Sequence, residues 1–372
     1  MSPAPVRSRW PEFDDEQRAV VDQVLRSGKV NYWTGEQGRA FEQEFAQFVG
    51  VRHAVALANG TLALELALAA LDVGPGDEVV VPARTFIASA SCVVARGARP
   101  VVVDVDPVSQ TLSADTIAAG LTARTKAIVC VHLAGRPCDM DPILDLARRH
   151  NLRVIEDCAQ AHGAEYRGRR VGSLGDAAAF SFCQDKIMTT GGEGGMLLTD
   201  CEHAWRRAWS YKDHGKDYDA VHHADHPPGF RWLHHSFGSN WRMTEMQAAL
   251  GRVQLRRLPE WLAARRRNAG LLARHCRELP ALEVETLPAD IHHAYYRFYA
   301  FVKPEALSHG RSRDDVMAEL TARGVPCSVG SCGELHREQA SASRGPQSTL
   351  PRARRLADRS LAFLVDHTLT AA

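Results

Sequence analysis

The chain has 372 residues, 45% of them hydrophobic, and its 45 Lys and Arg against 44 Asp and Glu give a formal net charge of +1. This length and apolar fraction predict a sizeable core and two domains. No strongly basic segment, signal-peptide core or apolar stretch of bilayer-spanning length is present, so we expect a cytoplasmic protein without a nucleic-acid or membrane partner. Nine scattered cysteines without a Cys-x-x-Cys pair predict reduced thiols and no metal site.

Short apolar runs alternate with helical patterns from about residue 54 to 200. The runs are β-branched or tightly bounded by Gly and Pro, so they predict strands at residues 78–82, 100–105, 126–132, 152–157, 177–182 and 196–200. Residues 86–96, 113–120 and 141–150 have helical spacing. This alternation is typical of a wound α/β sheet, in which parallel strands end at one ligand-binding edge. Asp157 and Lys186 both follow predicted strand ends.

After Thr244, a plausible N-cap, the sequence predicts a long helix. We place a domain boundary within it, so that residues 1–258 form a large domain and residues 259–372 a smaller α+β domain. The smaller domain should contain a strand at 295–302 and a helix at 314–323, and its residues 339–355 have the composition of a mobile loop. The run of arginines at 265–267 predicts a solvated helix face.

Four local features could contact one cofactor, and the first is a helix start. Asn59, Gly60 and Thr61 precede a helix rich in Ala and Leu. Free backbone N–H groups at such a start, together with the Thr61 hydroxyl, suit a phosphate. An ordinary helix cap would give the same pattern.

The second and third features offer groups for a planar, charged ring. Asp157 closes a hydrophobic strand, and Gln160 lies one turn further on. The Asp157 carboxylate could pair with a protonated heterocyclic nitrogen and Gln160 could hydrogen-bond a phenolic oxygen, although Asp157 could equally cap a helix. Phe86, just past a strand end, could lie against the ring, whereas an isolated aromatic residue usually packs in a core.

Lys186 is the fourth feature, and it is one of only six lysines in an arginine-rich chain. Arginine replaces lysine as a surface charge but cannot become an amine nucleophile. Burial and nearby positive charge would lower the pKa of Lys186 and allow a Schiff base with a carbonyl or with pyridoxal phosphate; a surface lysine in a turn is the alternative. Ser181 could donate to a phosphate, and the GGEGG that follows Lys186 fits no Walker loop or dinucleotide fingerprint.

Six strings of the sequence carry a family resemblance. In this order, ANGTLAL, PARTFIASA, VHLAGRPCDM, VIEDCAQAHGAEYRGRRVGSLGDAAAFSF, DKIMTTGGEGGMLLTD and NWRMTEMQAALGRVQL resemble the DegT/DnrJ/EryC1/StrS family of pyridoxal-phosphate-dependent sugar aminotransferases. The resemblance spans roughly residues 30–335. It implies the fold-type I aminotransferase architecture, α/β, with a large mixed, mostly parallel sheet domain and a smaller α+β C-terminal domain. It also implies a homodimer with active sites at the interface.

The resemblance assigns a role to each candidate residue. Lys186 resembles the Schiff-base lysine, Asp157 the partner of the pyridine nitrogen and Gln160 the residue near the ring hydroxyl. Phe86 resembles the ring-stacking aromatic residue, Thr61 and Ser181 resemble the phosphate ligands, and Asn240 resembles a phosphate ligand supplied by the neighbouring subunit. Gly60, beside Thr61, completes the expected cofactor-binding residues.

The implied reaction moves an amino group from glutamate or glutamine to a keto group of a nucleotide-linked keto-deoxysugar, in cell-surface polysaccharide or secondary-metabolite sugar biosynthesis. The segment FCQDK before the lysine differs from the Pro- or Thr-containing versions of nucleotide-sugar members, and some cyclitol and aminobenzoate-pathway relatives carry Gln there. A keto-cyclitol acceptor therefore remains an alternative.

Two further functions compete with the aminotransferase. Sugar dehydratases of this fold resemble the family with histidine in place of the lysine, so Lys186 argues against that activity. A non-catalytic regulatory protein would need no electron sink or amine nucleophile. A histidine cluster at His222, His223, His226, His234 and His235 could bind metal, but its spacing matches no zinc site, and we expect a mobile loop near the substrate entrance.

Overall fold

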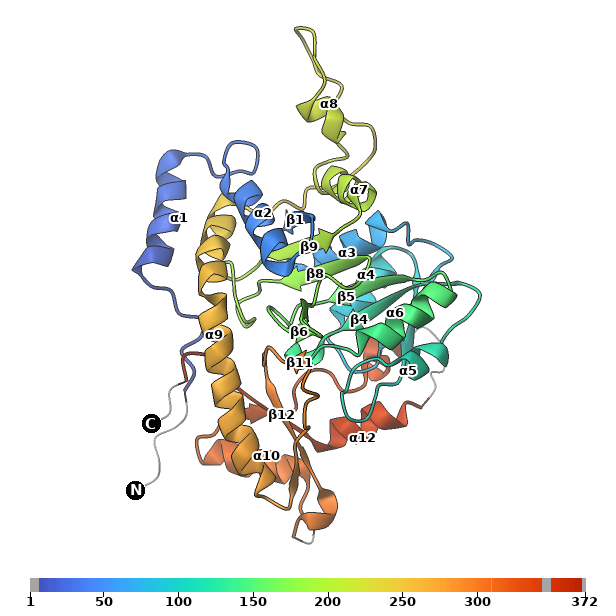
Figure 1. Cartoon of the computed structure of the whole chain (residues 1–372), viewed down its shortest axis with the longest axis vertical. Helices are drawn as coiled ribbons and strands as arrows, with labels where there is room; N and C mark the ends of the chain where they lie inside the picture. Colours follow the sequence, from blue (N-terminus) through green and yellow to red (C-terminus); the bar gives the residue numbers. More distant parts are fainter. Residues whose placement is uncertain (1–6, 309, 343–348, 370–372) are drawn as a thin grey trace.

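The computed structural model describes residues 7–308, 310–342 and 349–369. Figure 1 shows a large sheet and a smaller sheet, both flanked by one long helix, α9 (Glu245–Arg277), while α8 (Tyr218–His222) projects outward at the end far from the small sheet. Within the described part, no helix combines the length and the apolarity that crossing a membrane requires. None of the nine cysteines is in a disulfide.

The large sheet has seven strands, all predicted except the first. In spatial order they are β1 (His53–Leu57), β9 (Gly195–Thr199), β8 (Ala177–Ser181), β5 (Arg153–Asp157), β4 (Thr125–Val131), β2 (Glu78–Pro82) and β3 (Arg99–Val103). The strands from β8 to β3 pair in parallel, whereas β9 pairs antiparallel with both β8 and β1. The expected mixed, mostly parallel α/β sheet is confirmed.

Helices cover both faces of this sheet because its strands are apolar on both sides. Along β4, Ile128 and Cys130 belong to one buried cluster, while Ala127, Val129 and Val131 belong to the other. The helices outside the small part are α1 (Asp15–Ser27), α2 (Gln37–Val49), α3 (Gly60–Ala70), α4 (Ala88–Ala95), α5 (Ala114–Ala118), α6 (Met140–Arg149) and α7 (Glu202–Lys212). Residues of α2, α6 and α9 pack in the first cluster, and residues of α3, α4 and α7 in the second.

The small part is a four-stranded antiparallel sheet against the second half of α9. Its order is β10 (Leu282–Glu283), β12 (Phe298–Val302), β14 (Ser360–Phe363) and β13 (Cys327–Ser328), and β11 (Ile291–His292) instead joins β6 (Glu165–Tyr166) and β7 (Arg169–Arg170). The predicted helix at 314–323 is α10 (Arg313–Ala322). Along α9, Leu258 and Leu262 pack with the large sheet, and Ala269 and Ala273 with the small one. The domain boundary after residue 258 stays a prediction.

Two expectations from composition are wrong. The predicted loop at 339–355 contains α11 (Gln339–Ala342) and the start of α12 (Pro351–Arg359); its residues 343–348 lie outside the described part. Helix α12 forms because it buries Ala353 and Leu356 on one face, and the Asp104 carboxylate accepts from the Ala353 N–H at 2.8 Å.

The arginine run on α9 is not a uniformly solvated face. Arg265 is buried and donates to the Tyr295 carbonyl at 3.2 Å, whereas Arg267 is exposed. Burial lowers the pKa of Arg265 to about 10, with Asp366 opposing the shift. The helix therefore turns one arginine of the run inward, where a backbone carbonyl and a nearby carboxylate compensate its charge.

Candidate active site

A cavity of about 700 Å³ lies at the carboxyl edge of the parallel strands, between the large and the small part. It brings together seven of the eight predicted site residues, namely Gly60, Thr61, Phe86, Asp157, Gln160, Ser181 and Lys186. The small part contributes Tyr296, Arg297, Ser328, Gly330 and Ser331. Asn240, the eighth, does not line this cavity.

The start of α3 forms an anion-binding corner of the cavity. The Asn59 side chain caps the helix by accepting from the Leu62 N–H at 3.0 Å, and the N–H groups of Gly60 and Thr61 lie outside this cap. A Cβ atom on Gly60 would sit 2.5 Å from the Ser181 Cβ, so only glycine allows this close approach. The helix start therefore has both an ordinary cap and free backbone N–H groups. Together with the hydroxyls of Ser181 and Thr61, these N–H groups suit a phosphate.

Asp157 is a buried carboxylate at the end of β5. Its Oδ2 accepts from the Ser89 hydroxyl at 2.8 Å and its Oδ1 from the Ala159 N–H at 3.2 Å. Burial raises the pKa of Asp157, with both hydrogen bonds opposing that shift. Because Ser89 gives its only hydrogen to Asp157, the contact of 2.8 Å between Thr85 and Ser89 has Thr85 as the donor. Asp157 thus lines the cavity as an acceptor held in place by a hydroxyl chain.

Gln160 and Phe86 complete the ring-binding groups. The Gln160 side-chain oxygen accepts from the Ala134 N–H at 2.7 Å, and its nitrogen donates to the Ser331 hydroxyl at 3.2 Å. These bonds fix the amide orientation and leave one N–H of Gln160 free to donate. Phe86 lines the cavity with 64% of its surface exposed, which excludes the alternative that it packs in the core.

Lys186 follows β8 and points its amine toward an acidic, aromatic corner. Its Nζ lies 3.4 Å from an Asp185 oxygen and 4.9 Å from the centre of the Tyr296 ring, and the Tyr296 hydroxyl donates to Asp185. Burial favours the neutral amine, but Tyr296 and Asp185 outweigh it and raise the pKa of Lys186. The expected lowering of this pKa is therefore wrong for the protein without a ligand, because its nearest charge is negative. The amine is not a surface lysine: only 17% of the side chain is exposed.

A buried polar cluster supports β5 behind Asp157. His132, Glu156 and Cys158 bring ligand-type atoms within 4.8 Å of one another, as in a metal site. Their atoms are engaged, however: His132 accepts from the Cys138 N–H and contacts Glu156 at 3.0 Å, and Glu156 also accepts from three backbone N–H groups. Burial opposes the charge of Glu156, but these partners lower its pKa. We assign the cluster a structural role.

Asn240 lies at the base of the arm that carries α8; the arm consists of residues 214–239, between the paired residues Asp213 and Asn240. Asn240 is exposed, and its backbone bridges to Asp213, which accepts from Arg242 at 2.6 Å. The arm extends away from the body in Figure 1 and exposes Phe237 completely. Of the histidine cluster, His223 contacts Asp219 at 2.9 Å, and none of its members joins a metal-like group within the part of the chain that the structure describes.

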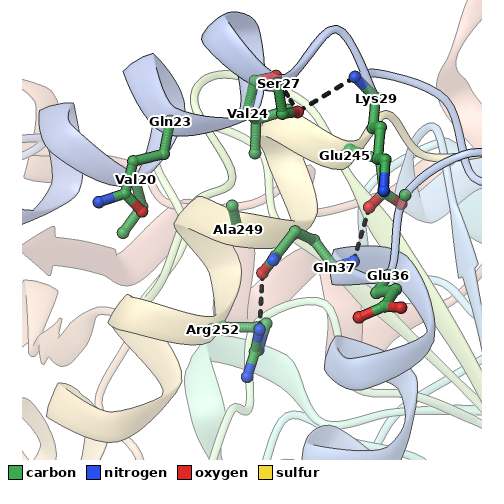
Figure 2. Close-up of a pocket in the computed structure, with 11 residues that line it drawn as sticks. Val20, Gln23, Val24, Ser27, Lys29, Glu36, Gln37, Glu245, Ala249 and Arg252 are labelled. Carbon is green, nitrogen blue, oxygen red and sulfur yellow. Dashed lines mark hydrogen bonds between the residues drawn. The ribbon is translucent and has the colours of Figure 1, made fainter.

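A second pocket, of about 410 Å³, lies between α1, α2 and α9 (Figure 2). Glu245 is buried there and accepts from the Gln37 and Gly38 N–H groups at 2.6 and 3.0 Å, which caps α2. Arg252 donates to the Gln37 side chain at 2.6 Å, as Figure 2 shows, and to Glu44. Because these polar groups satisfy one another, the pocket offers no reactive centre.

Sequence reasoning missed several cavity residues. Thr85, which lines the cavity, and Ser89, which donates to Asp157, both lie within the string PARTFIASA, so a hydroxyl one turn beyond Phe86 is an available signal. Asp185 was noted only as a departure from the family. The sequence predicts Tyr296 and Arg297 within a strand at 295–302, but β12 begins at Phe298, and no local signal links the two residues to Lys186 across more than a hundred residues.

Comparison with known proteins places the chain among sugar-modifying enzymes. The DegT/DnrJ/EryC1/StrS aminotransferase family matches residues 11–372. The GDP-perosamine synthase of Caulobacter vibrioides is 44% identical over 318 residues, which are 85% of this chain and 81% of that protein. The L-glutamine:2-deoxy-scyllo-inosose aminotransferase of Streptoalloteichus tenebrarius is 40% identical over 337 residues, 87% of this chain and 78% of that protein.

A solved structure repeats the fold almost completely. The aminotransferase from Psychrobacter cryohalolentis has a TM-score of 0.96 and 54% identity, and the match covers 98% of this chain and 95% of that one.

Proposed function

Because the chain belongs to the DegT/DnrJ/EryC1/StrS aminotransferase family, we propose that it uses pyridoxal phosphate to move an amino group from glutamate or glutamine to a keto group of a nucleotide-linked keto-deoxysugar. One observation carries this proposal. A single cavity holds a lysine with only 17% of its side chain exposed, a buried carboxylate and a helix start with free amides, which come from three separate segments of the chain.

These residues fit the shape and charge of pyridoxal phosphate. The start of α3 and Ser181 would hold the phosphate, Phe86 would cover one face of the ring, and Gln160 would donate to its hydroxyl. Asp157 has no cationic partner of its own within ion-pair distance among the described residues, and burial raises its pKa. A protonated ring nitrogen would supply the missing positive charge.

When bound, pyridoxal phosphate supplies an electron sink for the charge that develops at the substrate α-carbon. Asp157 keeps the proton on the ring nitrogen. Lys186 holds the cofactor and, once an amino substrate takes its place, its amine moves the proton at the substrate carbon. Between these roles, the Lys186 ammonium would pair with the Asp185 carboxylate, which lies 3.4 Å from its Nζ. Both half-reactions use one site, so ping-pong kinetics should follow.

We extend the proposal to a homodimer. Asn240 lies outside the cavity of its own chain, on the base of a projecting arm whose Phe237 is fully exposed. An amide there can serve as the phosphate ligand that the family resemblance expects from a neighbouring subunit. The two-domain division, at residue 258 within α9, belongs to the same proposal.

The relatives support two acceptor classes. GDP-perosamine synthase favours a nucleotide-linked sugar, and this is our first choice. The scyllo-inosose aminotransferase favours a keto-cyclitol as the second candidate, in agreement with Gln184 two residues before the lysine.

A half-reaction assay decides between them. Glutamate or glutamine should change the absorption spectrum of the cofactor bound to the purified protein, and the correct acceptor should reverse that change. We expect reversal by a nucleotide keto-sugar and not by a keto-inositol. A protein that binds the cofactor but shows no spectral change with either donor would contradict the aminotransferase and favour a regulatory role.

A further inference from the structure

Arg297 is a cation of the cavity wall, and in the part of the chain that the structure describes no carboxylate lies within ion-pair distance of it. It immediately precedes β12 and lines the cavity. Its guanidinium donates once, to the Tyr296 carbonyl at 3.2 Å, and its Cζ lies 4.3 Å from the centre of the Tyr296 ring. Its charge acts on Asp185 across the cavity, without forming an ion pair. By contrast, Arg136, in the neighbouring pocket, pairs with Glu285 at 2.8 Å.

The acidic groups closest to the chemistry are already committed. Asp185 accepts from Tyr296 and pairs with Lys186, and Asp157 accepts from Ser89. The phosphate position lies at the start of α3 and Ser181, on the large part of the protein. Arg297 belongs to the small part, and its bond to the Tyr296 carbonyl and its contact with the Tyr296 ring leave the other N–H groups of its guanidinium open to a ligand.

Arg297 and Lys186 approach the same aromatic ring. The Lys186 Nζ lies 4.9 Å and the Arg297 Cζ 4.3 Å from the Tyr296 ring centre. Because both cations line one cavity and contact one ring, a substrate whose nitrogen or keto carbon reaches the position of the Lys186 amine has Arg297 within its reach. The planar guanidinium has a fork of N–H groups that matches a carboxylate in two parallel hydrogen bonds.

We propose that Arg297 is a substrate-carboxylate site of this enzyme. The proposal rests on the proposed aminotransferase function and adds a specificity-determining residue to it. A carboxylate can come from two sources: the amino donor, which is an amino acid, or an acceptor sugar that is itself oxidised to a uronate. The chemistry of recognition is the same for both.

Calorimetric titration of the cofactor-loaded protein with glutarate tests the site without any reaction, because glutarate has two carboxylates and no amino group. We expect Arg297→Met to bind glutarate roughly ten- to a hundredfold more weakly, the effect of losing a charge-assisted hydrogen-bonded pair. Arg297→Lys should retain part of the affinity. Arg267→Met, the same change at an exposed position on α9, is the matched control and should bind as the unaltered protein does.

Two kinetic comparisons identify the source of the carboxylate. If the donor supplies it, Arg297→Met raises the KM for glutamate but not for an amine without a carboxylate. If the acceptor supplies it, the variant loses its preference for a nucleotide keto-uronate over the same keto-sugar with a hydroxymethyl group. Either result supports the proposal.

The proposal would be overturned if Arg297→Met changed none of three quantities: the affinity for glutarate, the KM for glutamate and the preference for the uronate. Equal weakening of both acceptors, with glutarate and glutamate unaffected, would also overturn it, because it would indicate contact with the nucleotide phosphates. The proposed function fails separately, if the unaltered protein takes up no cofactor or shows no half-reaction; where the cofactor binds but no half-reaction follows, glutarate binding still reports on Arg297.

Discussion

The two walls of the cavity differ in how they are built. The wall on the large part consists of strand ends and a helix start, so Asp157, Ser181 and Gly60 are each fixed by the secondary structure that carries them. The wall on the small part consists of Tyr296, Arg297 and the segment around Ser331, which lie outside the strands, next to β12 and β13. This contrast assigns general cofactor chemistry to the first wall and substrate choice to the second.

Removing the amine should have the largest effect on the wall of the large part. In the proposed mechanism, Lys186→Ala deletes both the group that holds the cofactor and the base that moves the proton, so we expect the glutamate-driven spectral change to slow by at least about a thousandfold. Single-turnover absorbance measures it. Lys303→Ala, outside the cavity, is the control. Conversion at the normal rate in Lys186→Ala would remove the role given to this residue.

Neutralising the buried Asp157 carboxylate should have the second-largest effect. Asp157→Asn keeps the shape of the side chain, so the fold should persist, but the amide cannot hold a proton on the ring nitrogen. We expect the glutamate half-reaction to slow by roughly a hundred- to a thousandfold, the scale of losing one aligned electrostatic partner. The affinity for glutarate should stay unchanged. If glutarate affinity fell as much as the rate did, the separation between the two walls would be wrong.

The same contrast explains which parts could be predicted from sequence. The strand ends were predictable because parallel strands need apolar runs, and the residue that closes each run falls at the ligand edge. The sequence predicts Tyr296 only as a strand residue, because nothing near it in the sequence indicates that its hydroxyl reaches Asp185. Helix α12 was missed for a related reason: a composition rich in Arg and Ser hid the spacing of Ala353 and Leu356, which matters only where they pack against Ala83, Val105 and Phe301.

Tyr296, on the wall of the small part, contacts Asp185 and Lys186 on the wall of the large part, and this contact predicts a pH effect on cofactor uptake. Lys186 reacts as a neutral amine, and Asp185 and Tyr296 raise its pKa despite burial, so capture of pyridoxal phosphate by the cofactor-free protein should accelerate as pH rises through that pKa. Asp185→Asn removes the negative charge and should move this profile to lower pH, with faster capture at neutral pH. Asp185→Glu should restore the original profile.

The other charged or titratable groups near the amine should leave that shift intact. Cys183 raises the pKa of Lys186 only as a lesser contributor, and His162 stays neutral because burial lowers its pKa to about 3. Asp157 lies in the same cavity, with its carboxylate bound to Ser89. Tyr296→Phe, which keeps the ring but frees Asp185, separates the hydroxyl from the carboxylate. A profile that stays unmoved in Asp185→Asn would mean that the amine lies elsewhere when it reacts.

The smallest effect should come from the hydroxyl chain of Thr85 and Ser89 behind Asp157. It tests whether this chain sets the pKa of Asp157 on the wall of the large part. Ser89→Ala removes a donor that stabilises the ionised carboxylate against burial, so the pKa of Asp157 should rise further. The half-reaction should slow by roughly three- to tenfold, equivalent to about 1 kcal/mol. Its acid limb should move to higher pH, because Asp157 then protonates earlier as the pH falls. Thr85→Val leaves Ser89 its bond to Asp157 and should shift the limb less. A slower reaction without a moved acid limb would show that Ser89 only packs against Asp157 and does not set its charge.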